Sequence, residues 1–111
     1  MIGGHSNIIE HVFNISRGDE KAIEKVILDE NLQYIHMVFG KDAGLPVHVS
    51  NSNVYLTVVR GILTIGLDDQ GDHEYAAGHV LKIPVKTRMH VRNLHDTVLE
   101  LIVVKAPAPQ V

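Results

Sequence analysis

Short segments of alternating apolar and polar residues, each followed by a turn signal, fill the chain from residue 22 to residue 105. Clear examples are AIEKVILDE, NLQYIHMVFG, NVYLTVVRG and TVLELIVVKA, which are rich in the β-branched residues that favour strands. Turn residues such as the DDQG of residues 68–71 separate them. No crossover helix fits between the segments, so parallel βαβ architecture is excluded. The sequence predicts an all-β antiparallel fold, either a sandwich or a closed barrel.

The composition narrows the class of protein. A length of 111 residues fits one domain, and 45% hydrophobic with 21% charged residues is a globular mixture. A net charge of -3 supplies no basic surface, so no nucleic-acid partner is expected. The absence of cysteine excludes disulfides and cysteine-bound metals. Without a signal peptide or an apolar run of roughly 18 residues, we expect a cytoplasmic protein with no membrane partner.

The two ends of the chain differ from its body. Residues 1–21 are predicted to form either a short helix or an extended arm. Ile8, Ile9, Val12 and Phe13 recur at helical spacing, after Ser6 or Asn7 as a cap. Residues 106–111 form a proline-rich tail that should lie on the surface. Residues 1–111 are therefore expected to be a single domain, with its strands between residues 22 and 105.

A set of framework residues marks turns at a definite spacing. Gly61 and Gly78 suit turns that need a positive φ, and proline fixes φ where the chain leaves a strand. Pro84 and Asn93 follow these glycines at matching positions. In this spacing, residues 22–105 resemble the cupin superfamily. That resemblance implies a small RmlC-like jelly-roll barrel, also called a double-stranded β-helix. Asp42 and Lys86 stand where two further glycines of the family pattern would be. Four residues carry the resemblance: Gly61, Gly78, Pro84 and Asn93.

The metal-binding positions of the family are mostly replaced in this chain. The resemblance places His48 at the first histidine position. Ser50 stands at the second histidine, Val54 at the glutamate and Met89 at the last histidine. One ligand of four is therefore retained, and no metal cofactor is favoured. The alternative is a divalent transition metal held by His48 with His36 and His90, since imidazole suits such ions.

The interior of the barrel is the predicted site. We expect a small molecule to bind there, because barrel mouths are usual places for small ligands. The alternative is a metal-dependent lyase, isomerase or dioxygenase that uses atypical ligands, so whether the chain is an enzyme stays open. A third hypothesis is a barrel that serves only as a dimerising element. The predicted ligand-binding residues are His48, Ser50, Asn53, Met89 and Asn93.

Both faces of one predicted strand carry apolar residues. Val54, Leu56 and Val58 form the predicted inner set, and Tyr55, Thr57 and Val59 alternate with them. An outer sheet face that is partly apolar needs a cover. Since two-fold pairing is the commonest homo-oligomer, we expect a homodimer in which the N-terminal apolar cluster helps to cover this face.

Overall fold

Alternation of buried and more exposed residues shapes the central strands of this protein, most clearly at residues 53–60 and 99–106. The computed structural model describes residues 8–109. None of these residues forms a helix, and accordingly none offers a helix that could cross a membrane. The strands are β1 (Ala22–Leu28), β2 (Gln33–Phe39), β3 (His48–Val49), β4 (Asn53–Arg60), β5 (Ile62–Leu67), β6 (Asp72–Ala76), β7 (Val80–Ile83), β8 (Arg88–Arg92) and β9 (Leu99–Ala106).

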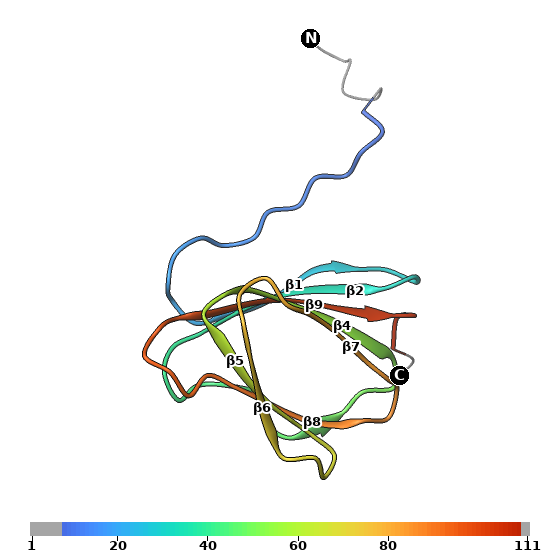
Figure 1. Ribbon diagram of the computed structural model, residues 1–111. Coiled ribbons are helices and arrows are strands. Elements are labelled where there is room, and N and C mark those ends of the chain that lie inside the picture. Colours follow the sequence, from blue (N-terminus) through green and yellow to red (C-terminus); the bar gives the residue numbers. More distant parts are fainter. Residues whose placement is uncertain (1–7, 110–111) are drawn as a thin grey trace.

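The strands form two antiparallel sheets that face each other (Figure 1). The larger sheet has the order β1-β2-β9-β4-β7, and the smaller has the order β3-β8-β5-β6. Successive strands repeatedly cross from one sheet to the other, which is the jelly-roll arrangement. The predicted jelly roll is thus confirmed. The sheets do not close into one continuous barrel, because each keeps two edge strands: β1 and β7 in the larger sheet, β3 and β6 in the smaller.

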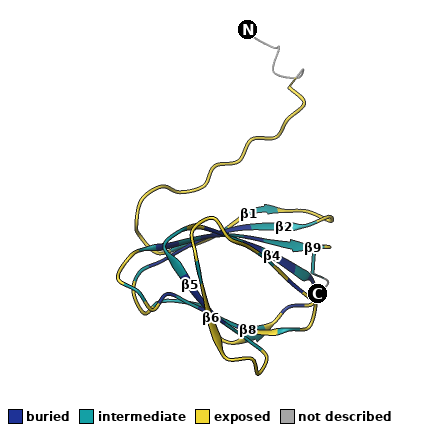
Figure 2. Cartoon of the chain, viewed as in Figure 1, coloured by how far each residue is buried: buried dark blue, intermediate teal, exposed yellow. Residues whose placement is uncertain are grey.

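The core lies between the two sheets. On β4, Val54, Leu56 and Val58 are each only 1% exposed, as the alternation predicts. Tyr55 and Thr57 point to the outer face of the larger sheet and stay partly exposed. The neighbouring strand β9 repeats the pattern, and Figure 2 shows buried segments concentrated along these central strands. Burial of these aliphatic side chains is the main stabilising contribution to the fold.

The framework positions explain how the strands are joined. Gly61 links β4 to β5 with a φ of +82°, and a Cβ there would collide with the carbonyl oxygen of Val98. Glycine is therefore required at this position both for conformation and for space. Asp42 and Lys86, which replace two family glycines, both have a φ of 67°. The backbone keeps the left-handed conformation at these positions although the glycines are gone.

The N-terminal segment leaves the body of the molecule. Residues 8–15 run away from the sheets in Figure 1 as an extended arm, and their apolar side chains are exposed. Of the two predicted alternatives, the described residues show the extended one, while Ser6 and Asn7 lie outside them. The root of the arm is fixed where Ser16 donates two hydrogen bonds to Glu24, each of 3.0 Å.

Candidate functional site

Two of the predicted ligand-binding residues lie together inside the fold. His48 on β3 and Met89 on β8 are opposite each other in the antiparallel pairing. Opposite residues of an antiparallel pair share a sheet face, and both side chains turn toward the larger sheet. They line a cavity of about 40 Å³ with Val54, Leu56 and other aliphatic residues. His48 and Met89 therefore form the inner part of a pocket, as the family resemblance implies.

The other three predicted residues make hydrogen bonds within the protein and lie outside the linings of the inner cavity and of the larger pocket beside it. Ser50 Oγ accepts a bond from the Ser52 amide at 3.1 Å, and Asn53 Oδ1 accepts one from the Val85 amide at 3.1 Å. Asn93 is fully buried. Its side-chain amide donates to the carbonyl groups of Phe39 and Thr97, and its Oδ1 accepts from the amide of His95. Asn93 thus joins three chain segments, and both of its N–H donors are used within the protein.

A larger pocket opens beside the inner cavity. We call it the mouth pocket; it lies between strands β1 and β2 of the larger sheet and the chain segment that enters β3. Its volume is about 260 Å³, just below the roughly 300–1,000 Å³ of typical drug-sized sites. It shares Met37, Leu45, His48 and Lys105 with the inner cavity. The mouth pocket is lined by Ile23, Lys25, Ile35, Met37, Leu45, Pro46, His48 and Lys105.

Two lysines bring positive charge to this apolar pocket. Lys105 continues the inward alternation of β9 after Val103, and Lys25 lies on the inward face of β1 opposite Ile35. Within residues 8–109, no carboxylate forms an ion pair with either lysine. Burial and then the nearby charge of Lys25 lower the pKa of Lys105. An apolar pocket with two cations and no lining acid is suited to an organic anion.

His48 adds a directed polar group to the same pocket. Its Nδ1 lies 3.0 Å from the carbonyl oxygen of Pro46. Because a carbonyl only accepts, Nδ1 carries the proton in this bond, and Nε2 of the neutral ring is left as an acceptor. The ring is therefore oriented by the backbone, with one nitrogen available to a ligand.

The residues at the family's metal positions do not fit a divalent ion. They supply one imidazole from His48, one thioether from Met89 and the aliphatic side chain of Val54. The Ser50 hydroxyl is occupied by the Ser52 amide. A stable site for such an ion needs three or more nitrogen, oxygen or thiolate ligands. No group of three potential metal-binding His, Asp or Glu side chains is found among residues 8–109.

The three histidines of the alternative metal site do not meet. His36 alternates with the inward residues Ile35 and Met37 of β2, so it lies on the outer face of the larger sheet. His90 lies between the inward residues of β8, on the outer face of the smaller sheet. Only His48 faces the space between the sheets, which separates the three imidazoles by whole sheet layers.

His36 is held by two carboxylates instead of a metal. It is fully buried, with Nδ1 2.7 Å from Glu24 Oε1 and Nε2 2.7 Å from Glu100 Oε2. Burial opposes the charged ring, but the hydrogen bonds to Glu100 and Glu24 prevail and raise the pKa of His36. Arg60 extends the network from Glu100 to Asp19 at the root of the arm. These ion pairs and hydrogen bonds therefore hold the root of the arm against the outer face of the larger sheet.

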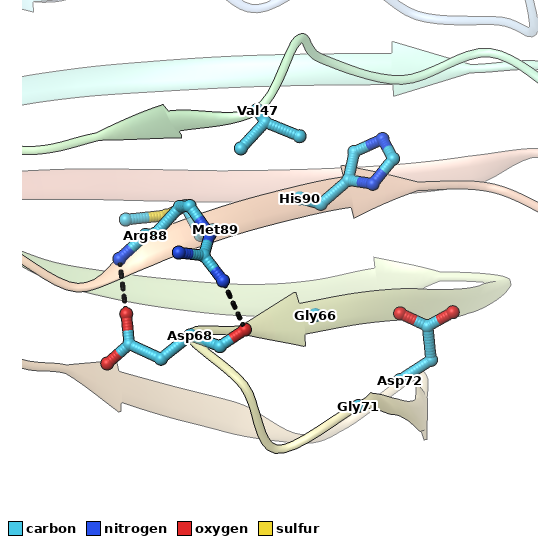
Figure 3. A pocket seen from close by; sticks show the side chains of 8 residues that line it. All are labelled: Val47, Gly66, Asp68, Gly71, Asp72, Arg88, Met89 and His90. Atoms are coloured by element: carbon cyan, nitrogen blue, oxygen red, sulfur yellow. Dashed lines mark hydrogen bonds between the residues drawn. The ribbon is translucent and has the colours of Figure 1, made fainter.

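A third pocket lies at the turn between β5 and β6 (Figure 3). Its volume is about 220 Å³. Figure 3 shows Arg88 bonded to Asp68: its backbone amide donates to the carboxylate at 2.9 Å, and its guanidinium donates to the backbone carbonyl oxygen at 2.8 Å. The Arg88 guanidinium also forms an ion pair with Asp69 at 3.0 Å, and the Arg92 guanidinium forms one with Asp72. The arginines beside this pocket are thus neutralised by neighbouring aspartates, whereas the lysines of the mouth pocket are not.

The mouth-pocket lysines were not among the sequence-predicted site residues. The signal for Lys105 was nevertheless in the sequence, since Leu99, Leu101, Val103 and Lys105 alternate without a break. Lys25 had a weaker signal, because a bulge between Lys25 and Ile27 interrupts the alternation of β1.

Two antiparallel sheets in jelly-roll order, with a ligand-sized pocket between them, define a double-stranded β-helix protein of the cupin kind. No family model matches the chain. The uncharacterized protein MJ0764 of Methanocaldococcus jannaschii is 36% identical over 104 residues, which cover 93% of this chain and 90% of that protein. Its crystal structure, described as an RmlC-like cupin family protein with a double-stranded β-helix fold, matches with a TM-score of 0.87 over 90% of this chain and 93% of that one. This chain belongs to the RmlC-like cupin family.

More distant structures share the fold alone. A cupin superfamily protein of Desulfitobacterium hafniense has a TM-score of 0.72 at 12% identity, covering 84% of this chain and 83% of that chain. An RmlC-like cupin of Shewanella frigidimarina has a TM-score of 0.67 at 22% identity, covering 84% of this chain and 89% of that chain. The chemistry of the pocket in this chain therefore depends on its own residues.

Proposed function

We propose that this protein binds a small organic carboxylate, with an apolar body, in the mouth pocket. The observation that carries the proposal is the pair Lys25 and Lys105, which line an apolar pocket without a carboxylate partner among the described residues. Two like charges near apolar surface disfavour each other and lose hydration. A bound anion offsets both the repulsion between the two lysines and their loss of hydration. The pocket is therefore suited to a negatively charged ligand.

The walls of the pocket select the rest of the ligand. Ile23, Ile35, Met37 and Leu45 present aliphatic surface beside the lysines. The inner cavity of about 40 Å³ extends this surface toward Met89 but has room for little more than a methyl group or one water. A short aliphatic acid fits these dimensions. His48 Nε2 supplies one further hydrogen-bonding group that can fix the orientation of a polar substituent.

The proposal is tested by calorimetric titration with hexanoate and with hexanamide. The two probes share an apolar chain and differ in charge. Hexanoate should bind and hexanamide should bind at least tenfold more weakly, because a hydrogen bond to a charged group is worth about 1.5–3 kcal/mol. Lys105→Met should reduce hexanoate affinity by a similar factor. Lys82→Met is the matched control, because Lys82 is exposed on the outer face of the same sheet.

Equal affinities for the acid and the amide would contradict the charge argument. Equal loss of hexanoate binding in Lys105→Met and Lys82→Met would contradict binding in the mouth pocket. Either result would remove the mouth pocket as the carboxylate site.

A further inference from the structure

We infer that Lys105 captures the carbonyl group of an oxo acid as a covalent imine, while Lys25 holds the carboxylate of the same ligand. The inference rests on the proposed carboxylate site and adds a reactive group to it. It names oxo acids, which carry both a carbonyl and a carboxylate, as the ligand class.

The two lysines differ in depth. Lys25 is exposed and lines the mouth pocket but not the inner cavity. Lys105 is partly buried and lines both of them. A ligand entering from solvent meets Lys25 first and Lys105 further in. Its charged end therefore belongs beside Lys25, where water still solvates it, and its less polar carbonyl beside Lys105.

Reactivity also favours Lys105 over the other lysines. Only a neutral amine can attack a carbonyl carbon, and an ordinary lysine is almost fully protonated at neutral pH. An apolar pocket and a neighbouring cation both disfavour the ammonium form, and together they activate lysines as nucleophiles. Lys105 has both features: Val103 and Met37 line the inner cavity with it, and Lys25 lines the mouth pocket with it. Its lowered pKa has these same two causes.

The proposed step is balanced without a co-reactant. The Nζ lone pair of neutral Lys105 forms a bond to the carbonyl carbon, and the C=O π pair moves to oxygen. A proton passes from nitrogen to that oxygen, which gives a carbinolamine. The carbinolamine then loses its hydroxyl group and the remaining N–H proton as one water molecule, and a C=N bond is left. The step is reversible by addition of water.

The experiment traps the imine in the full-length protein with sodium borohydride, using pyruvate and levulinate as probes. Their carbonyl and carboxylate groups stand at two different separations, so the two probes test two distances between the imine and the bound carboxylate. Hydride from borohydride and a proton from water convert the imine to a stable secondary amine. The protein should then gain the mass of the oxo acid less one oxygen atom. Peptide mapping should place this mass on Lys105, at a yield at least tenfold above that on Lys82.

Two variants separate charge from nucleophilicity. Lys105→Arg keeps the positive charge but has no amine that can form a neutral nucleophile at ordinary pH. It should lose the adduct and still bind hexanoate. Lys25→Gln should keep a reactive amine at residue 105 but raise the probe concentration needed for trapping.

The outcomes are distinct for the two proposals. Hexanoate binding without an adduct on Lys105 from either probe would overturn the imine and leave the carboxylate site standing. An adduct spread evenly over the exposed lysines would overturn the imine as well. An adduct on Lys105 without hexanoate binding would support the reactive amine and refute the carboxylate pocket.

Discussion

Asp42 and Lys86 share a left-handed backbone conformation with a φ of 67°, although neither is a glycine. Short Asp side chains tolerate this region, whereas the longer Lys side chain is strained there by roughly 1–2 kcal/mol. Lys86→Gly should remove that strain, partly offset by the greater freedom of glycine in the unfolded chain. We predict that the free energy of unfolding in urea rises by about 0.5–1 kcal/mol.

Lys86→Ala is the control for this prediction, because it removes the same side chain but keeps a Cβ. It should leave the free energy of unfolding nearly unchanged. An equal rise in the alanine and glycine variants would show that side-chain charge, and not backbone strain, limits stability at this turn.

His36 should make stability depend on pH. Its pKa is raised from the ordinary value of 6.5, chiefly by the bonds to Glu100 and Glu24 against the opposing effect of burial. Because the pKa is raised on folding, the protonated His36 contributes its full stabilisation below pH 6.5. This contribution is lost as the pH rises through the pKa of His36 in the folded protein. We predict that the free energy of unfolding falls as the pH rises above 6.5. His36→Gln should reduce this fall and cost about 1.5–3 kcal/mol below pH 6.5.

His90→Gln serves as the matched histidine control, since His90 also lies on an outer sheet face but makes no hydrogen bond through its ring among the described residues. It should keep the pH dependence of the wild type. If denaturant titrations show the wild-type pH dependence of the free energy of unfolding in both the His36 and the His90 variants, the bonds of His36 to its two carboxylates are not the source of that dependence.

The fold was predictable because its signals are local and repeated. Alternation along β4 identified its inward face, and Gly61 and Pro84 marked chain turns at the family spacing. Closure of the barrel was not predictable in the same way. Whether the two sheets join depends on hydrogen bonds at their edges, such as the short β3, which within residues 8–109 pairs with β8 alone.

The site was less predictable because a pocket joins residues from distant strands. The family pattern pointed to His48 and Met89, which do meet. It also suggested Ser50 and Asn93, whose hydrogen-bonding groups turned out to be used by nearby backbone. His36 shows the limit of residue type as evidence: a histidine suited to metal binding lies instead between two carboxylates on the opposite face.

Lys105→Met should stabilise the protein while it weakens carboxylate binding at least tenfold. Burial and the charge of Lys25 make the Lys105 ammonium unfavourable in the folded state. A methionine of similar length fills the same space without a charge. We predict a rise of about 0.5–2 kcal/mol in the free energy of unfolding, which is the usual size of a single stabilising substitution. Thermal denaturation with and without hexanoate measures both effects. A destabilised variant would indicate that Lys105 has a structural partner and not a ligand-binding role.

The carboxylate affinity should also fall at high pH. Lys105 loses its charge at a lower pH than an ordinary lysine, whose pKa is 10.5. Hexanoate affinity should therefore decrease with pH before other lysines titrate, and Lys105→Arg should move the decrease to higher pH because arginine stays charged. Titration calorimetry at several pH values checks this, and an unchanged profile in the arginine variant would contradict it.

We predict that the protein is a homodimer held together by its N-terminal arm. Ile9 is 91% and Val12 76% exposed on the arm, while Val59 and Val80 are 45% and 68% exposed at the outer face of β4 and β7. Both surfaces lack a cover within residues 8–109, and each copy carries one of each. A two-fold exchange, in which each arm lies on the partner's sheet, therefore covers all four surfaces at once.

Light scattering of the full chain should give the dimer mass at micromolar concentration. Replacing Ile9 and Val12 by serine should raise the dimer dissociation constant at least tenfold, since each buried aliphatic side chain contributes about 1.5–3 kcal/mol. The matched control is Val49→Ser, because Val49 is 53% exposed on the smaller sheet, away from the proposed interface. A wild-type monomer would refute the dimer, and equal weakening by the arm variant and Val49→Ser would refute the arm as its contact.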